Sequence, residues 1–200
     1  MAEFTRDATQ VWYITTPETA ADDPLFFDMM EDRGYLATPY PIQNPRYRLA
    51  AFSVWRFQRA PEASELLLTF GEERISLVNW FSQGEPAPCA SIRLQSWWRS
   101  EAVPLHNYSL TVILTTQDGT PVLNLDGAIG ETLMQLWEPE RLYFDDRHLT
   151  LPCDLTAGTY DIRLGLYWQS EQGFEQVSAQ APDGQPLGER VVLLSFEISR

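Results

Sequence analysis

Short runs of alternating apolar and polar residues, separated by turn signals, follow one another along the chain from about residue 61. They predict strands over residues 65–70, 75–81, 90–99, 109–116, 133–137, 143–151, 158–168 and 189–198. The intervening turn signals are rich in Gly, Pro and Asp, and Gln117-Asp-Gly119 is typical of a hairpin turn. Short strands at this spacing predict a mainly β protein, with an antiparallel β-sandwich of Ig-like or jelly-roll type over residues 61–200.

Residues 1–60 have a different pattern, which predicts a strand–helix–strand unit. The range 10–15 is rich in β-branched and aromatic residues and predicts a strand. A stretch with one apolar face, from a start at Asp23 to a stop at Gly34, predicts a helix. After a proline-rich connector, the range 47–57 predicts a second strand. We expect this unit to pack on the sandwich.

Composition excludes several classes of function. The chain has 200 residues, of which 28 are acidic and 14 basic, giving a net charge of −14. This charge argues against a nucleic-acid partner, because such proteins neutralise phosphates with basic side chains. All 14 basic residues are Arg, so Schiff-base and P-loop lysine chemistry are excluded. No apolar run approaches the length of a membrane span, and the first residues do not resemble a signal peptide.

Two cysteines, Cys89 and Cys153, lie at the edges of predicted strands. Neither has the close Cys or His neighbour that a zinc site needs, so we expect no metal there. In an oxidising compartment the two could form one disulfide. The alternative is a pair of free, half-buried thiols, because the geometry of a disulfide cannot be deduced from sequence.

Other candidate sites for chemistry are weak. The run Asp145-Asp-Arg-His148 places Asp146 and His148 on one face of a strand, but a metal site needs more convergent ligands. No Gly-x-Ser-x-Gly elbow is present, and the paired carboxylates are numerous because the whole chain is acidic. We therefore expect no cofactor, no metal and no enzymatic activity from this chain by itself.

The tryptophans carry more weight as binding residues. Trp97 and Trp98 are neighbours in a predicted strand, so they point to opposite faces. One belongs to the core, and the other lies on the outer face or under the N-terminal unit. Trp137 comes just before a predicted strand. Exposed aromatic rings can stack on sugars, although the same rings could equally be core residues.

Several motifs recur in the order of a known family. They are Leu67–Leu77, Ile92–Arg99, Tyr108–Gly119, Trp137–Glu140, Leu149–Pro152 and Ala157–Tyr167. In this order they resemble the soluble C-terminal β-sandwich of bacterial membrane glycosyltransferases that are similar to dolichyl-phosphate-mannose–protein mannosyltransferases. The resemblance covers nearly the whole chain. One departure is that the family's Pro-Gly-Glu turn is Pro139-Glu140 here, without the glycine.

The resemblance implies a location and a role. It implies an extracytoplasmic domain, periplasmic or at the cell surface, tethered through the membrane-embedded part of a parent chain. The family's catalytic acidic residues lie in that membrane part, outside the matching residues, so no active site carries over. Our leading hypothesis is a non-catalytic accessory domain that binds or orients glycan, with candidate residues Trp97, Trp137, Arg141, Tyr143 and Asp145. The alternative is a structural or protein-interaction module with no ligand.

Overall fold

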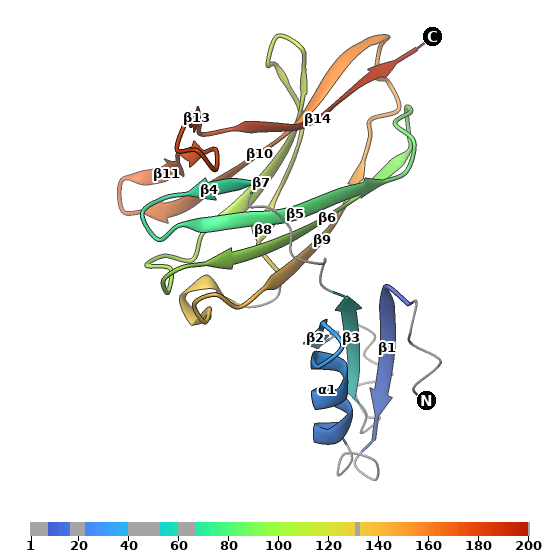
Figure 1. Ribbon diagram of the computed structural model, residues 1–200. Helices are drawn as coiled ribbons and strands as arrows, with labels where there is room; N and C mark the ends of the chain where they lie inside the picture. The colour runs from blue at the N-terminus through green and yellow to red at the C-terminus, as the bar shows by residue number, and fades with distance from the viewer. Residues whose placement is uncertain (1–7, 17–22, 40–52, 60–66, 131–132, 200) are drawn as a thin grey trace. The chain divides into compact units, whose positions relative to one another are not determined.

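The computed structural model describes residues 8–16, 23–39, 53–59, 67–130 and 133–199. The chain divides into two compact units, residues 1–62 and 63–200. Throughout the described residues the fold is mainly β, the paired strands are antiparallel, and one short α-helix lies among the N-terminal strands (Figure 1). These features confirm the predicted fold class. The packing of the first unit on the second stays a prediction.

In its described residues, the first unit is a three-stranded antiparallel sheet with one helix. Its elements are β1 (Gln10–Thr15), α1 (Asp23–Glu31), β2 (Tyr35–Pro39) and β3 (Ser53–Arg59), with strand order β1-β3-β2. Met30 of α1, Tyr35 of β2 and Phe57 of β3 are buried and form a small core with several aromatic rings. The sequence pattern did not predict β2, because Pro39 at its end was assigned to the proline-rich connector. Residues 47–52 of the predicted second strand lie outside the described residues.

No helix in the described ranges is long and apolar enough to cross a membrane.

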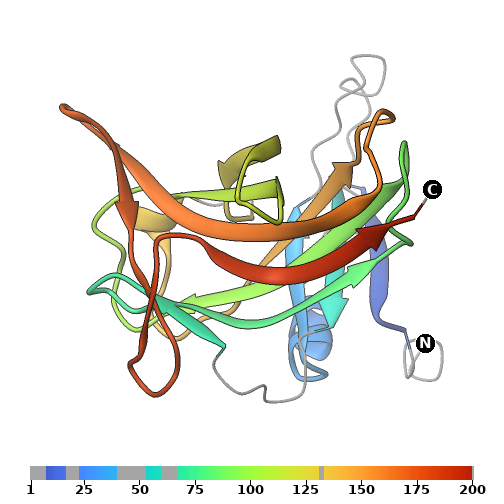
Figure 2. The ribbon, with the colours of Figure 1, turned by 90° about the horizontal axis from the view of Figure 1, so that it is seen from above.

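The second unit consists of two antiparallel sheets. One contains β4 (Leu68–Phe70), β5 (Ile75–Gln83), β6 (Ser91–Ser100), β9 (Tyr143–Thr150), β12 (Ala179–Gln180) and β13 (Pro186–Gly188), in the order β13-β12-β4-β5-β6-β9. The other contains β7 (Ser109–Thr116), β8 (Pro121–Ala128), β10 (Gly158–Ser170), β11 (Gly173–Val177) and β14 (Val191–Ile198). Its strand order is β11-β10-β7-β8. The remaining strand, β14, pairs with β10 and lies beside it in Figure 2.

The core lies between these two sheets. Alternate residues of each strand point inward, such as Ile92 and Leu94 of β6 and Ile162 and Leu164 of β10. Trp98 belongs to this core, and its neighbour Trp97 does not, as the sequence analysis expected of adjacent strand residues. The same alternation leaves the odd-numbered residues of β7 and β10 on the outer face of the five-stranded sheet.

One predicted strand, residues 133–137, is wrong. This segment contains the short 3₁₀ helix η2 (Met134–Leu136), and both Met134 and Trp137 are buried. Residues three apart lie on the same side of a 3₁₀ helix, so this spacing of buried residues fits a helical turn better than a strand. In the following turn, Glu140 adopts the left-handed conformation with φ of 64°.

The second unit contains one disulfide, between Cys89 and Cys153. It joins the segment before β6 to the segment after β9. Backbone hydrogen bonds hold the same two segments together, with the Leu151 N–H donating to the Ala90 carbonyl over 2.8 Å. The sequence left open whether these two cysteines are bonded or free, and in the structure they form a disulfide.

Candidate functional site

Three of the five sequence-predicted binding residues lie together beside η2. The Trp137 ring stacks on the Tyr143 ring with centroids 4.1 Å apart, and the Arg141 guanidinium lies 6.0 Å from the Tyr143 centroid. Arg141 also donates a hydrogen bond to the Glu138 carboxylate over 2.8 Å. Trp137 is only 1% exposed. Trp137 is therefore a core residue, and its ring cannot serve as the platform for sugar stacking that the sequence suggested.

Trp97 is also buried, so it is not an exposed platform for stacking. Its side chain is completely buried and packs against Phe144 of β9, with ring centroids 4.8 Å apart. The pair follows from strand register, since Trp97 of β6 lies opposite Phe144 of β9. The sequence could place Trp97 on the face opposite Trp98, but it could not show that this position is covered.

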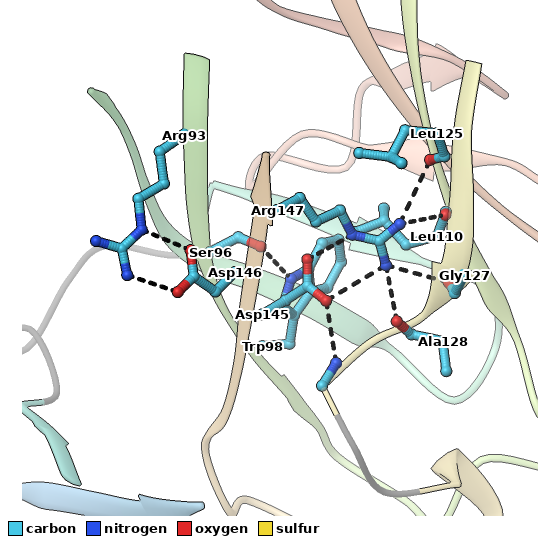
Figure 3. Close-up of polar contacts among 11 residues, drawn as sticks. Arg93, Ser96, Trp98, Leu110, Leu125, Gly127, Ala128, Asp145, Asp146 and Arg147 are labelled. Atoms are coloured by element: carbon cyan, nitrogen blue, oxygen red, sulfur yellow. Dashed lines mark hydrogen bonds and ion pairs between the residues drawn. The ribbon is translucent and has the colours of Figure 1, made fainter. Parts of the chain in front are cut away.

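Asp145, the fifth candidate, forms a buried ion pair with Arg147 between the two sheets. The Arg147 Nε donates to Asp145 Oδ2 over 2.7 Å, and the two side chains are 9% and 7% exposed. As Figure 3 shows, the guanidinium reaches from β9 to carbonyl oxygens of the opposite sheet. Its Nη1 and Nη2 donate over 2.7–3.4 Å to the carbonyls of Leu110, Leu125, Gly127 and Ala128. This ion pair holds the edges of the two sheets together. Its side chains form their hydrogen bonds with other groups of the protein.

The neighbouring Asp146 is engaged by a different arginine. Arg93 donates two hydrogen bonds to the Asp146 carboxylate, over 2.8 and 2.6 Å, on the other face of β9 (Figure 3). The acidic run that begins at Asp145 is thus divided between two faces of the sheet. Within the described ranges, no group of three or more His, Cys, Asp or Glu residues is placed to hold a metal ion.

A groove on the outer face of the five-stranded sheet is a better candidate site. It has a volume of about 210 Å³ and is lined by Thr111, Ile113, Asn124, Asp126, Tyr167, Phe174, Gln176 and Arg190. The first seven come from four adjacent strands, β8, β7, β10 and β11, and Arg190 comes just before β14. Strand register explains the gathering: Thr111 lies opposite Asp126, and Tyr167 lies opposite Gln176.

One end of the groove is aromatic. The Phe174 side chain is 68% exposed, and its ring meets the Tyr167 ring edge to face, with centroids 5.5 Å apart. A phenylalanine so exposed gains little from folding, because most of its apolar surface stays in water. The pair therefore offers an apolar surface to a ligand.

The other end of the groove is polar and internally ordered. The Thr111 hydroxyl donates to the Asn124 side-chain carbonyl over 2.9 Å, and the Asn124 amide donates to Asp126 Oδ2 over 2.5 Å. These bonds fix the orientation of the amide and of the carboxylate. Amides and carboxylates are suitable partners for hydroxyl groups. Gln176 adds a buried Oε1 that has no hydrogen-bond partner within the described part of the chain.

Gly165 places the Arg190 segment beside the groove. A Cβ atom at this position would lie 2.4 Å from the Glu189 carbonyl oxygen and 3.5 Å from the Arg190 Cγ. The chain before β14 can therefore pass close over β10 only because residue 165 has no side chain. This close approach brings Arg190 to the groove.

The sequence analysis did not select this groove. None of its lining residues is among the five sequence-predicted binding residues. A signal was present, since alternation along β10 places Tyr167 on the face opposite Leu164 and Leu166 of the core. Which outer face forms a groove depends on strand order, which the pattern of a single strand does not contain.

A second cavity, of about 590 Å³, lies at the end of the sandwich between residues 116–120 and 156–160. Its carboxylate, Asp118, accepts hydrogen bonds from the Thr116 hydroxyl and the Thr120 N–H, and these hold its pKa below the ordinary value. Asp118 therefore organises its own turn. The aromatic residue that lines this cavity, Tyr160, is only 4% exposed and offers far less surface than Phe174, so we favour the groove.

Comparison with known proteins gives distant likenesses. No protein-family model matches the sequence, and no curated protein matches it. The crystal structure of the C-terminal domain of wzt has a TM-score of 0.42 and 12% identity, covering 70% of this chain and 83% of that one. Bacteroides uniformis β-glucuronidase 2, covalently bound to cyclophellitol-6-carboxylate aziridine, has a TM-score of 0.34 and 16% identity, covering 66% of this chain and 16% of that one. At these scores the site must be judged from its own geometry.

Proposed function

We propose that the second unit binds a glycan in the groove on the outer face of its five-stranded sheet, without covalent chemistry. The observation that carries this proposal is the exposed Phe174 ring, which packs against the half-buried Tyr167 in one groove with an ordered amide and carboxylate. A sugar ring has apolar C–H surfaces and a rim of hydroxyl groups. The groove offers a partner to each of them.

The length of the groove indicates a short oligosaccharide. Its lining residues belong to four adjacent strands, and three inter-strand steps of about 4.8 Å give a span of roughly 14 Å. The aromatic pair and the Asn124–Asp126 pair stand at opposite ends of this span. One sugar would therefore stack on Phe174 while the hydroxyls of another bind Asn124 and Asp126.

Screening the full chain against immobilised cell-envelope glycans tests the proposal. We expect binding, and we expect Phe174→Ala to weaken it about fivefold or more, since aromatic stacking contributes on the order of 1 kcal/mol or more. Phe81→Ala is the matched control, because Phe81 is an exposed phenylalanine on the other sheet. The proposal fails if no glycan binds, or if the Phe174 and Phe81 variants bind alike.

We further propose that this domain is the extracytoplasmic accessory domain of a membrane glycosyltransferase-like protein, tethered through its parent chain. Two observations support the location: the family resemblance of the sequence motifs, and the Cys89–Cys153 disulfide, since disulfides persist in oxidising compartments. Sequencing the gene upstream of Met1 tests the tether. In-frame segments encoding several hydrophobic spans would support it, and a native start codon with nothing before it would exclude it.

A second function, that of an interaction module without ligand, is favoured by the first unit. Trp12 and Ile14 of β1 are 48% and 63% exposed, and they share the face of the strand opposite Tyr13. Tyr13 packs against the helix residue Phe26. If this sheet face binds a protein partner, Ile14→Ser should abolish capture of that partner by the full chain. Glycan binding in the groove should then be unaffected.

A further inference from the structure

Arg190 differs from the other arginines of the second unit. Seven arginines of this unit lie in the described ranges, and six of them have a carboxylate oxygen within 4.0 Å: Arg74, Arg93, Arg99, Arg141, Arg147 and Arg163. Arg190 has no such partner among the residues that the structure describes. In a chain with 28 acidic and 14 basic residues, carboxylates are in excess, so an unpaired guanidinium is unexpected.

The fold determines the position of Arg190 beside the groove. It lines the groove together with Tyr167 and Gln176, and the missing side chain of Gly165 allows its segment to lie against β10. Among the residues that the structure describes, two polar groups at this side of the groove thus lack a partner: the Arg190 guanidinium, which has no carboxylate partner, and the buried Gln176 Oε1, which has no hydrogen-bond partner. A guanidinium with all its donors available is suited to a planar anion, which it can hold with two parallel N–H···O bonds.

We propose that the glycan bound in this groove contains a sugar with a carboxylate group, a uronic acid in the simplest case, and that Arg190 binds the carboxylate. This inference rests on the proposed glycan-binding function. The Asp126 carboxylate lies on β8, at the other end of the groove, where it can accept hydrogen bonds from uncharged hydroxyls.

The net charge of the whole chain limits the class of ligand further. A net charge of −14 repels a densely charged polyanion at long range. At physiological salt, charges beyond about 8 Å are screened, so the local guanidinium dominates for a single carboxylate. The ligand class that fits both conditions is an oligosaccharide in which one acidic sugar lies among neutral ones.

Carboxyl reduction of the ligand provides the test. Each acidic oligosaccharide that binds the full chain is compared with its carboxyl-reduced form, in which the uronic acid has become the corresponding neutral sugar. We expect reduction to weaken binding about tenfold to a hundredfold, because a charge-assisted hydrogen-bonded pair is replaced by a hydroxyl contact. Equal binding of both forms overturns the inference and leaves glycan binding intact, whereas failure of every glycan to bind overturns both proposals.

Variants at Arg190 identify the group responsible. Arg190→Gln should weaken binding of the acidic form about tenfold or more and leave the reduced form nearly unchanged, and Arg190→Lys should be intermediate. Arg74→Gln removes the same charge from an exposed arginine that lies outside the groove, and it should bind as the parent does. If Arg190→Gln and Arg74→Gln have equal effects, general electrostatics accounts for the preference and the inference is wrong.

Discussion

The Arg147–Asp145 pair gives the sharpest prediction about stability. Arg147→Met keeps an unbranched apolar stem and removes the guanidinium. The Asp145 carboxylate, in a residue only 5% exposed, then keeps the Gly130 N–H as its remaining donor within the described residues. Four carbonyl oxygens of β7 and β8 each lose the hydrogen bond from this guanidinium at the same time. Removal of one partner from a buried ion pair costs about 3–5 kcal/mol.

Urea unfolding followed by tryptophan fluorescence measures this loss. With a slope of about 2 kcal/mol per molar urea, a loss of about 4 kcal/mol lowers the midpoint by about 2 M. Arg141→Met is the control, because the side chains of the Arg141–Glu138 pair are 51% and 70% exposed. Exposed pairs contribute less than about 1 kcal/mol.

A double variant separates the buried charge from the lost contacts. In Arg147→Met with Asp145→Leu, no unpaired carboxylate remains, so we expect part of the stability to return. A midpoint for Arg147→Met within about 0.3 M of the parent would refute the assignment of this pair as the fastening between the two sheets.

Three further predictions concern other parts of the second unit. Trp137→Ala should lower the free energy of unfolding by about 3–5 kcal/mol, as expected for a core ring, and should leave glycan affinity at low temperature unchanged. Cys89→Ser with Cys153→Ser should lower the stability by about 4 kcal/mol, since the disulfide closes a loop with a sequence separation of 64; equal urea midpoints for parent and variant would contradict this. The Ser195 hydroxyl donates a hydrogen bond to Asp161, and this bond, followed by the Arg163 guanidinium, holds the pKa of Asp161 below its ordinary value. The ionised carboxylate therefore stabilises the fold above its unfolded pKa of about 4. This stabilisation is lost as the pH falls through the lower folded pKa. Ser195→Ala should therefore destabilise at pH 7 and have a smaller effect at pH 2, and an effect that is equal at both values would exclude this coupling.

Much of the fold was predictable from local patterns. The mainly β class, the hairpin at Gln117–Gly119 and most long strands follow from alternation and turn residues, which report on the immediate neighbours of each residue. The wrong strand prediction at residues 133–137 has the same origin, because a five-residue run with four apolar side chains fits a strand and a helical turn nearly equally well. The spacing of Met134 and Trp137 distinguishes the two only when both are known to be buried.

The candidate site was not predictable in the same way. Trp97, Trp137 and Asp145 were chosen for their side-chain chemistry, and the structure buries all three. Phe174, by contrast, follows a glycine in a short strand and has no distinguishing pattern around it. Its importance arises because β11 lies beside β10, which brings it against Tyr167.

The sequence by itself therefore determined the class of fold, the excess of acidic groups and the pair of cysteines. The tertiary structure decided which aromatic rings are exposed, which arginine of the second unit has no carboxylate partner among the described residues, and why residue 165 is glycine. The physical reason is the range of the interactions. Side-chain alternation acts between residues two apart, whereas the groove depends on an order of strands that places residues 111, 126, 167, 176 and 190 side by side.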